Sequence, residues 1–274
     1  MWPEVVKQNE VALVANAGNT DRANWFAGHY TAWLGYALLQ EGRFDAARAH
    51  LMLMRSNQPR STRTDGASSL LFMQATYVME TERWRDTTFL GPPAPDTVVS
   101  EDHALATFLQ GVAALRSGHR QRAESALEAF DRGRFAVRAP PLAPNPRVVV
   151  MADQLRALLL NDAGRHEAAI ELLRKTAATE DTLPVEFGPP TIVQPTHELI
   201  GEFLLAMGRP DEAQREFGRA LERGPRRLRA LAGLYRSAVE DGDTGAATDA
   251  RRLLKETLTR ADTGILAGIL RAGQ

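Results

Sequence analysis

The sequence of 274 residues contains no cysteine. Disulfide bonds, thiolate metal sites and a cysteine nucleophile are therefore excluded. Long apolar runs are missing too, because even the most apolar short window, residues 155–160, is far below the roughly 18 residues that a membrane-spanning helix needs. An excess of one charge is also absent: 33 Lys and Arg stand against 34 Asp and Glu. These absences predict a protein that spans no membrane and carries no nucleic-acid-binding surface.

The basic stretch from Arg215 to Arg229 is interleaved with Glu216 and Glu222, which favours a solvated helix face over a nucleic-acid patch. The first residues show no basic region followed by an apolar run, so no secretory signal is predicted and the cytoplasm is the expected location. The first expected helix, Pro3 to Ala17, has no partner before it. We therefore expect the chain to begin in mid-repeat, as a fragment or shortened form would.

Signatures of common catalytic sites are missing as well. The sequence has no G-x-x-x-x-G-K-[ST] loop, no dinucleotide-binding glycine pattern and no G-x-S-x-G turn. Ser100 precedes Glu101, Asp102 and His103, but a helix N-cap followed by acidic first-turn residues explains this arrangement better than a nucleophile does. The sequence favours a protein that is not an enzyme and that holds no cofactor.

What is present is a repeated helical pattern, clearest between Thr196 and Pro225. Two short amphipathic helices are separated there by a turn at Gly208. Gly201 and Ala213 are small positions that allow close helix approach, whereas Leu204 and Phe217 fill the space between the helices. This stretch resembles a tetratricopeptide repeat, which is a helix–turn–helix unit that stacks into a solenoid.

The same pattern recurs near the beginning of the chain. Seven positions match at fixed spacing, with Leu34, Gly35, Leu38, Gly42, Ala47, Leu51 and Pro59 corresponding to Ile200, Gly201, Leu204, Gly208, Ala213, Phe217 and Pro225. Turns are expected near Gly42, Thr81, Gly118, Gly164, Gly208 and Gly242. The prediction is an all-α, tetratricopeptide-like solenoid over residues 1–274, with about six antiparallel pairs, an N-terminal helix and a cap at residues 264–270.

Individual helix limits follow from the apolar periodicity and the turn residues. Helices are expected at residues 21–40, 44–55, 70–80 and, cut short by prolines, around 84–90. Others are expected at residues 101–116, 121–132, 147–161, 165–179, 226–240 and 244–260. Proline-rich connections lie near residues 91–99, 139–146 and 181–195.

Two segments resemble a group of bacterial multi-repeat proteins of unassigned biochemical role. They are His29 to Leu51 and Leu183 to Leu221, and the second includes a Pro-Val-Glu-Phe-Gly-Pro-Pro loop outside the repeat code. Longer members of that group carry a His-rich helical region upstream of the point that corresponds to Met1. Any activity that depends on that region is not expected here.

A groove is the candidate site, because the first helix of each pair lines the concave side of such a solenoid. The repeat register predicts that this side carries partner-binding residues from three repeats: His29, Trp33, Tyr36, Glu198, Glu202, Arg229 and Arg236. The alternative is that the two aromatic residues pack between helices and that the carboxylates are a solvated face.

The connection from Asp181 to Pro195 is long and stiffened by prolines. It could fold over the groove, so that Glu186 and Phe187 beside His197 form one wall of a pocket, or it could be a plug that covers an interface. His197 and Glu198 begin a sequence that resembles a zinc helix, but position 201 is Gly where a second His is needed. No metal site is predicted.

The function favoured by the sequence is a non-catalytic scaffold that binds a protein or peptide partner in its groove. The alternative is a small-molecule or metal-binding protein, or an enzyme, with a pocket under residues 181–196. The apolar residues from Ile265 to Leu270 leave a homodimer as a further possibility.

Overall fold

The structure is a computed structural model that describes residues 2–15, 28–60, 65–86, 100–132, 145–185 and 189–272. These residues form helices and connections, and no strand occurs among them. The helices are α1 (Trp2–Ala15), α3 (His29–Gln40), α4 (Phe44–Asn57), η1 (Gln58–Arg60), α5 (Gly66–Thr81), α6 (Ser100–Arg116), α7 (Arg120–Asp131), α8 (Pro146–Asp162), α9 (His166–Asp181), α10 (Thr196–Ala206), α11 (Pro210–Arg223), α12 (Leu228–Asp241), α13 (Thr244–Thr257) and α14 (Ile265–Arg271). The all-α prediction is confirmed. None of these helices is both long and apolar enough to cross a lipid bilayer.

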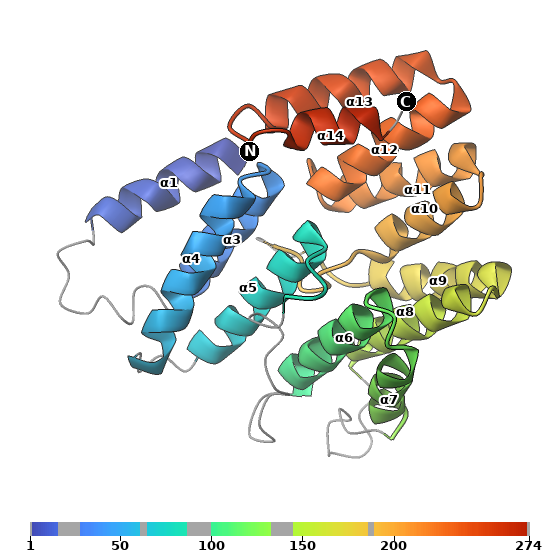
Figure 1. Ribbon diagram of the computed structural model, residues 1–274, viewed down its shortest axis with the longest axis horizontal. Coiled ribbons are helices and arrows are strands. Elements are labelled where there is room, and N and C mark those ends of the chain that lie inside the picture. Colours follow the sequence, from blue (N-terminus) through green and yellow to red (C-terminus); the bar gives the residue numbers. More distant parts are fainter. Residues whose placement is uncertain are drawn as a thin grey trace. The chain divides into compact units, whose positions relative to one another are not determined.

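Consecutive helices pack as antiparallel pairs, as Figure 1 shows for α8 with α9 and for α12 with α13. The turns of these pairs lie where the sequence predicts them. Gly42, Gly118, Gly164, Gly208 and Gly242 all adopt positive φ. Glycine has no Cβ, so it reverses the chain in this left-handed conformation without the steric cost that other residues meet.

Helix limits differ from the predictions at several places: α5 begins at Gly66 rather than at residue 70, and α13 ends at Thr257 rather than at residue 260. The helix expected from Asp21 begins at His29, after Gly28 in extended conformation, and residues 21–27 lie outside the described ranges. The partner helix expected to start near Trp84 does not start there, because residues 82–86 are turns and Glu82 has a φ of 55°. The rest of that expected helix, and the proline-rich stretches at 91–99 and 139–144, are outside the described residues.

The chain divides into two compact units, Met1–Thr81 with Gly224–Gln274, and Glu82–Arg223. We call them the terminal unit and the central unit. The single solenoid over residues 1–274 stays a prediction.

The central unit contains three helix pairs, α6–α7, α8–α9 and α10–α11, stacked in chain order. Small residues set their spacing. A Cβ atom built on Gly201 would lie 2.9 Å from the ring of Phe217 on α11. Phe217 is 1% exposed, so the aromatic ring fills the space that the missing side chain of Gly201 leaves. This is the pairing that the repeat register predicts.

The terminal unit joins both ends of the chain. Its centre is Arg227, which is 1% exposed, pairs with Glu80 at 2.8 Å and donates a hydrogen bond to the hydroxyl of Tyr36 at 2.7 Å. Gln40 on α3 accepts a hydrogen bond from the backbone N–H of Leu228. The first helices and α12 therefore share one core, although they are far apart in the sequence.

A second link in the terminal unit ties the segment before α14 to the α3–α4 turn. The carboxylate of Asp262 accepts a hydrogen bond from the backbone N–H of Asp45, and the N–H of Asp262 donates to the carbonyl of Gly42. Helix α14 packs on α12 and α13, and its Ile265 side chain approaches Gly42. The predicted C-terminal cap is thus a short helix whose aliphatic side chains are only partly buried.

Candidate functional site

The predicted site residues of the terminal unit lie in different environments. Tyr36 is 1% exposed and contacts Trp2 edge-on at 5.4 Å, so it offers no surface to a partner in this structure. Trp33 is partly buried and has the ring of Tyr30 at 6.3 Å. Arg229 donates to the carbonyl of Met79 at 2.8 Å, and Arg236 is partly buried. His29 begins α3, and its side chain lies outside the described part.

The predicted residues of the central unit are on α10 or just before it. Glu186 and Phe187 lie outside the described residues, so their place beside a pocket stays a prediction. Glu198 is 1% exposed, whereas the side chain of Glu202 is 22% exposed. Of the predicted carboxylates on α10, only Glu202 therefore reaches solvent to a useful extent.

The described part of the connection before α10 is fixed by buried hydrogen bonds. Ile192 and Val193 are buried, and the Nε2 group of Gln154 on α8 donates to the carbonyl of Gln194 at 2.7 Å and to the hydroxyl of Thr196 at 2.9 Å. Glu180 at the end of α9 accepts from the backbone N–H of Thr196. Residues 192–196 thus lie against α8 and α9 and cover apolar surface, as the plug alternative describes.

Two amide oxygens beside this connection have no hydrogen-bond partner in the described part of the chain. They are Oε1 of Gln154, a residue that is 0% exposed, and Oε1 of Gln194, which is 2% exposed. The amide of Gln154 cannot be turned round to help, because its nitrogen already faces two oxygen acceptors. Buried acceptors are nearly always satisfied in proteins, so this pair calls for an N–H or O–H donor from elsewhere.

The partly exposed side of these two buried amides is held by two long polar contacts. The Nε2 atom of Gln194 is 3.5 Å from Glu202, and the guanidinium of Arg116 at the end of α6 is 3.8 Å from the same carboxylate. Arg116 is on α6 and Glu202 on α10, so this contact joins the first and third helix pairs of the central unit. We call Arg116, Gln154, Gln194, Thr196 and Glu202 the amide cluster.

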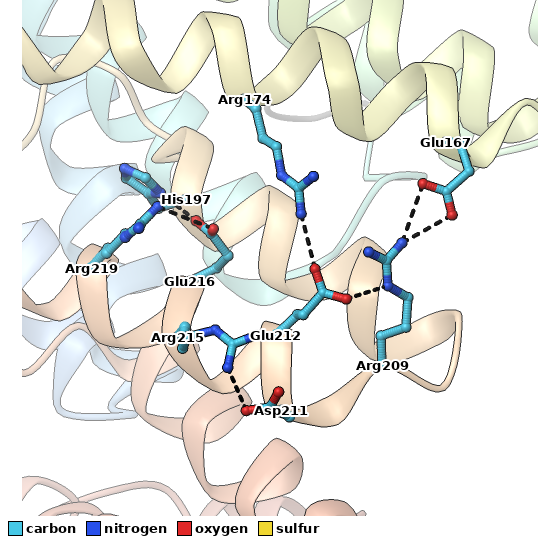
Figure 2. A network of polar contacts seen from close by, with 9 residues as sticks. All are labelled: Glu167, Arg174, His197, Arg209, Asp211, Glu212, Arg215, Glu216 and Arg219. Carbon is cyan, nitrogen blue, oxygen red and sulfur yellow. Dashed lines mark hydrogen bonds and ion pairs between the residues drawn. The ribbon is translucent and has the colours of Figure 1, made fainter.

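His197 lies on the first turn of α10 and has a carboxylate at each ring nitrogen. Its Nδ1 atom is 2.5 Å from Glu216 on α11, and its Nε2 atom is 3.2 Å from Asp181 on α9. Burial of the ring lowers the pKa of His197, but the hydrogen bonds and charges of Glu216 and Asp181 outweigh that effect and raise its pKa above the usual value. Figure 2 shows His197 and Arg219 converging on Glu216.

This arrangement bears on the zinc-helix comparison. Both nitrogens of His197 are used by carboxylates, so the ring could coordinate a metal only after giving up one of these contacts. Within the described ranges, no three His, Asp or Glu side chains are grouped so that they could hold a metal ion.

The outer face of α9 and α11 carries a ladder of ion pairs (Figure 2). Arg209 contacts Glu167 at 2.9 Å and Glu212 at 2.6 Å, and Arg174 reaches Glu212 at 3.0 Å. The hydrogen bond from Arg209, helped by the charges of Arg209 and Arg174, lowers the pKa of Glu212, although burial opposes this. Glu167 and Arg174 are exposed and Arg209 and Glu212 are partly exposed, and such pairs contribute little each, so the ladder is a solvated surface.

Arg116, Gln154 and Gln194 were not among the residues predicted from the sequence. Gln154 gives a signal after the fact, because a lone amide in the run Val150–Leu160 falls on the buried side of an otherwise apolar helix. Arg116 and Gln194 give none, because an arginine in a last helical turn and a glutamine in a loop are both ordinary.

Comparison with known proteins adds no relative to this picture. No protein-family model matches the sequence, and no curated protein is significantly similar to it.

Proposed function

We propose that the chain is a tetratricopeptide-like, non-catalytic scaffold whose central unit binds an extended segment of a partner protein at the amide cluster. The observation that carries this proposal is the pair of buried, unpartnered amide oxygens of Gln154 and Gln194 beside a long, partly exposed ion pair. Polar groups that a fold leaves incompletely paired are costly, and a ligand that pairs them recovers that cost on binding.

The chemistry of the cluster matches a peptide backbone. The two amide oxygens need N–H donors, whereas the guanidinium of Arg116 needs an oxygen acceptor closer than the 3.8 Å at which Glu202 lies. An extended peptide presents N–H and C=O groups in alternation, so one segment supplies both. A carboxylate on that segment would take Arg116 with two hydrogen bonds.

Access to the cluster runs through its exposed edge. The side chain of Arg116 is 39% exposed and that of Glu202 is 22% exposed, whereas both glutamines are buried. Opening the Arg116–Glu202 contact costs little, because a partly exposed pair beyond hydrogen-bond distance contributes about 0–1 kcal/mol. The partner therefore displaces Glu202 from Arg116 before its backbone reaches the amide oxygens.

The proposal is tested with a random peptide display library selected on the full chain. We expect enriched peptides to carry at least one acidic residue and to bind Arg116→Ala, Gln194→Met and Glu202→Gln differently from the unmodified chain. Arg116→Ala should weaken binding by about tenfold or more, since a hydrogen bond to a charged group contributes roughly 1.5–3 kcal/mol.

Arg174→Ala is the matched control, because this exposed arginine on α9 also pairs with a carboxylate but lies on the outer ladder. Peptides that bind Arg116→Ala and Arg174→Ala equally well would place the binding surface elsewhere. If peptides are enriched but Gln194→Met leaves their binding unchanged, the two amide oxygens do not take part in binding.

A small polar molecule with the same mix of donors and acceptors is the second candidate for the cluster. It is favoured by the burial of both glutamines, which suits a compact ligand better than a long one. Thermal unfolding in the presence of single amino acids and dipeptides separates the two cases, because only the compact ligand would stabilise the chain without flanking residues.

Other parts of the interpretation stay predictions. The cytoplasmic location and the lack of a nucleic-acid partner rest on the composition. A homodimer rests on the partly exposed aliphatic side chains of α14.

A further inference from the structure

The contacts of His197 depend on how many protons its ring carries, and that number depends on pH. A neutral imidazole has one N–H donor and one bare nitrogen, whereas the imidazolium has two donors. Here both nitrogens face carboxylate oxygens, at 2.5 Å for Glu216 and 3.2 Å for Asp181. A bare nitrogen opposite a carboxylate would be repelled, so the two contacts exist together only while the ring carries both protons.

The charged groups around the ring are mixed in sign, and those that accept from it are acidic. Among the described residues, α9 contributes Glu180 and Asp181, α10 contributes Glu198, and α11 contributes Glu216, Arg219 and Arg223. The two arginines attach to the same carboxylates from the exposed side, at 3.3 Å for Arg219 to Glu216 and 3.9 Å for Arg223 to Asp181. The two arginines therefore stabilise the carboxylates from the exposed side, but they do not replace the N–H donors of the imidazole ring.

The end of α9 is fastened by few other contacts. Arg223 donates to the carbonyl groups of Asp181 and Leu183, and the N–H groups of Thr182 and Leu183 close the last turn onto Thr179 and Glu180. Val185, two residues further on, is 67% exposed. Glu180 accepts a hydrogen bond from the backbone N–H of Thr196, and the contact between His197 and Asp181 is a second side-chain bond that ties the end of α9 to α10.

We propose that His197 is a protonation latch, which holds the end of α9 and the following residues 182–185 on α10 while the ring carries two protons and releases Asp181 when it loses one. Release occurs at Asp181 because its contact is the longer one and its side chain is 47% exposed, so water replaces the ring at little cost. The proton that remains stays on Nδ1, where Glu216 is nearer and only 9% exposed. This latch does not depend on the partner-binding proposal.

The direction of the switch follows from the sign of the shift. The pKa of His197 in the closed state is raised above its usual value of 6.5. Release of Asp181 removes its share of that elevation while Glu216 stays in place, so the closed state binds the proton more tightly than the open one, and the latch opens as the pH rises through the closed-state pKa. Each unit by which the closed-state pKa exceeds the open-state one changes the closing equilibrium tenfold, or about 1.4 kcal/mol.

The test follows the ring and the turn together on the full chain. Nuclear magnetic resonance of the imidazole reports the pKa of His197, and hydrogen exchange of the Thr182 and Leu183 amides, corrected for intrinsic rates, reports the turn. Between about pH 5.5 and about pH 8.5 we expect protection of these two amides to fall by about tenfold per unit of pKa elevation. The fall should have the same midpoint as the ring titration.

Two variants remove the pH step in different ways. His197→Asn replaces the imidazole with an amide, which is polar but does not titrate, so the pH step should vanish. Asp181→Asn removes the carboxylate that needs the second proton, so the pKa of His197 should fall and the step should shrink. Asp211→Asn, at an exposed carboxylate of α11 that pairs with Arg215, is the matched control and should leave both unchanged.

Three results would overturn the latch. The ring could titrate at or below its usual value, the two amides could keep the same protection across the ring titration, or the step in Asp181→Asn could be as large as in the unmodified chain. The amide of Ala169 near the start of α9 serves as an internal reference, since a fall there as well would mean that the whole helix loosens rather than its end.

Discussion

Gly201 and Phe217 show how one residue sets the distance between two helices of the central unit. A Cβ atom at position 201 would lie 2.9 Å from the aromatic ring, closer than side-chain atoms approach one another. Glycine has a low helix propensity, but its missing side chain leaves space for the ring of Phe217. This ring is 1% exposed and fills the interface between α10 and α11.

Gly201→Leu should lower the free energy of unfolding by about 1–3 kcal/mol through overpacking, and Phe217→Ala should lower it by about 3–5 kcal/mol through a cavity. Denaturant unfolding measures both. Gly218→Ala on α11 is the control, because no atom lies within 4 Å of its would-be Cβ. That change should be neutral or add up to about 1 kcal/mol. A stabilising Gly201→Leu would show that the close approach is wrong.

Arg227 presents the opposite case, a charge that is buried and paired. Arg227→Met should cost about 3–5 kcal/mol, because it leaves the carboxylate of Glu80 buried without its guanidinium partner at 2.8 Å. The double variant Arg227→Met with Glu80→Leu should recover most of that loss, since neither buried charge remains. Thermal unfolding of the single and double variants decides this, and a double variant no more stable than the single one would mean that other contacts of Arg227 dominate.

His50 on α4 gives a pH dependence opposite in sign to that of His197. Burial lowers the pKa of His50 to about 4, although its bond to the carbonyl of Thr31 partly opposes this. The unfolded chain, with a pKa of 6.5 for this group, then binds the proton more readily than the folded one. As far as His50 determines it, the free energy of unfolding should be highest above pH 6.5 and should fall by on the order of 3 kcal/mol as the pH drops toward 4.

His50→Gln tests this, because glutamine keeps a donor for Thr31 and does not titrate. Denaturant unfolding between about pH 7 and about pH 4.5 should show a shallower loss in the variant. Equal losses in both proteins would assign the acid sensitivity to other groups.

At the scale of the element, helix starts depend on local caps that differ from pair to pair. Asn145 and Asp243 accept hydrogen bonds from the backbone N–H groups of Arg147 and Ala246 at the starts of α8 and α13. Gly28, Arg43, His119 and Arg165 precede their helices without such a side-chain bond. The latter helices therefore rely on tertiary packing for their first turn.

Asp243→Ala should cost about 0.5–2 kcal/mol by removing the cap of α13. Asp249→Ala on the same helix is the control, because Asp249 is 74% exposed and its contact with Arg252 is 3.5 Å long. Thermal unfolding compares the two, and an equal effect would mean that charge rather than capping explains the loss.

At the scale of the whole molecule, the two ends of the chain build one unit. Arg227, Leu228 and Asp262 bind groups on the first helices, and the side chain of Trp2 donates to the carbonyl of Arg226 at 3.0 Å. Residues 1–81 without residues 224–274 would leave the carboxylate of Glu80 and the amide of Gln40 without these partners.

A chain that ends at residue 223 should therefore lose the terminal unit and keep the central one. Hydrogen exchange should show α3, α4 and α5 unprotected, while α8 and α9 retain their protection. Adding residues 224–274 as a separate fragment should restore part of the lost protection. Full protection of α3 in the shortened chain would contradict the shared core.

The sequence alone determined the helices and their turns, because these depend on local properties. Apolar spacing of 3.6 residues and a glycine that can adopt positive φ act within a few residues, and they placed the turns at Gly42, Gly118, Gly164, Gly208 and Gly242. The same local logic predicted the contact of Gly201 with Phe217, since both belong to one helix pair. It was wrong at Trp84 and Arg85, which lie in a turn, and residues 87–90 of that expected helix are outside the described ranges.

The tertiary structure alone decided which polar groups meet, because those contacts join distant parts of the chain. Arg227 and Tyr36 are 191 positions apart, and Gln154 bonds Thr196 across 42. His197, expected beside a binding pocket, lies between Asp181 and Glu216, and Tyr36, expected in a groove, lies in a core. The packing of the helices in three dimensions sets these partners. The periodicity along one helix carries no information about which other helix will cover it.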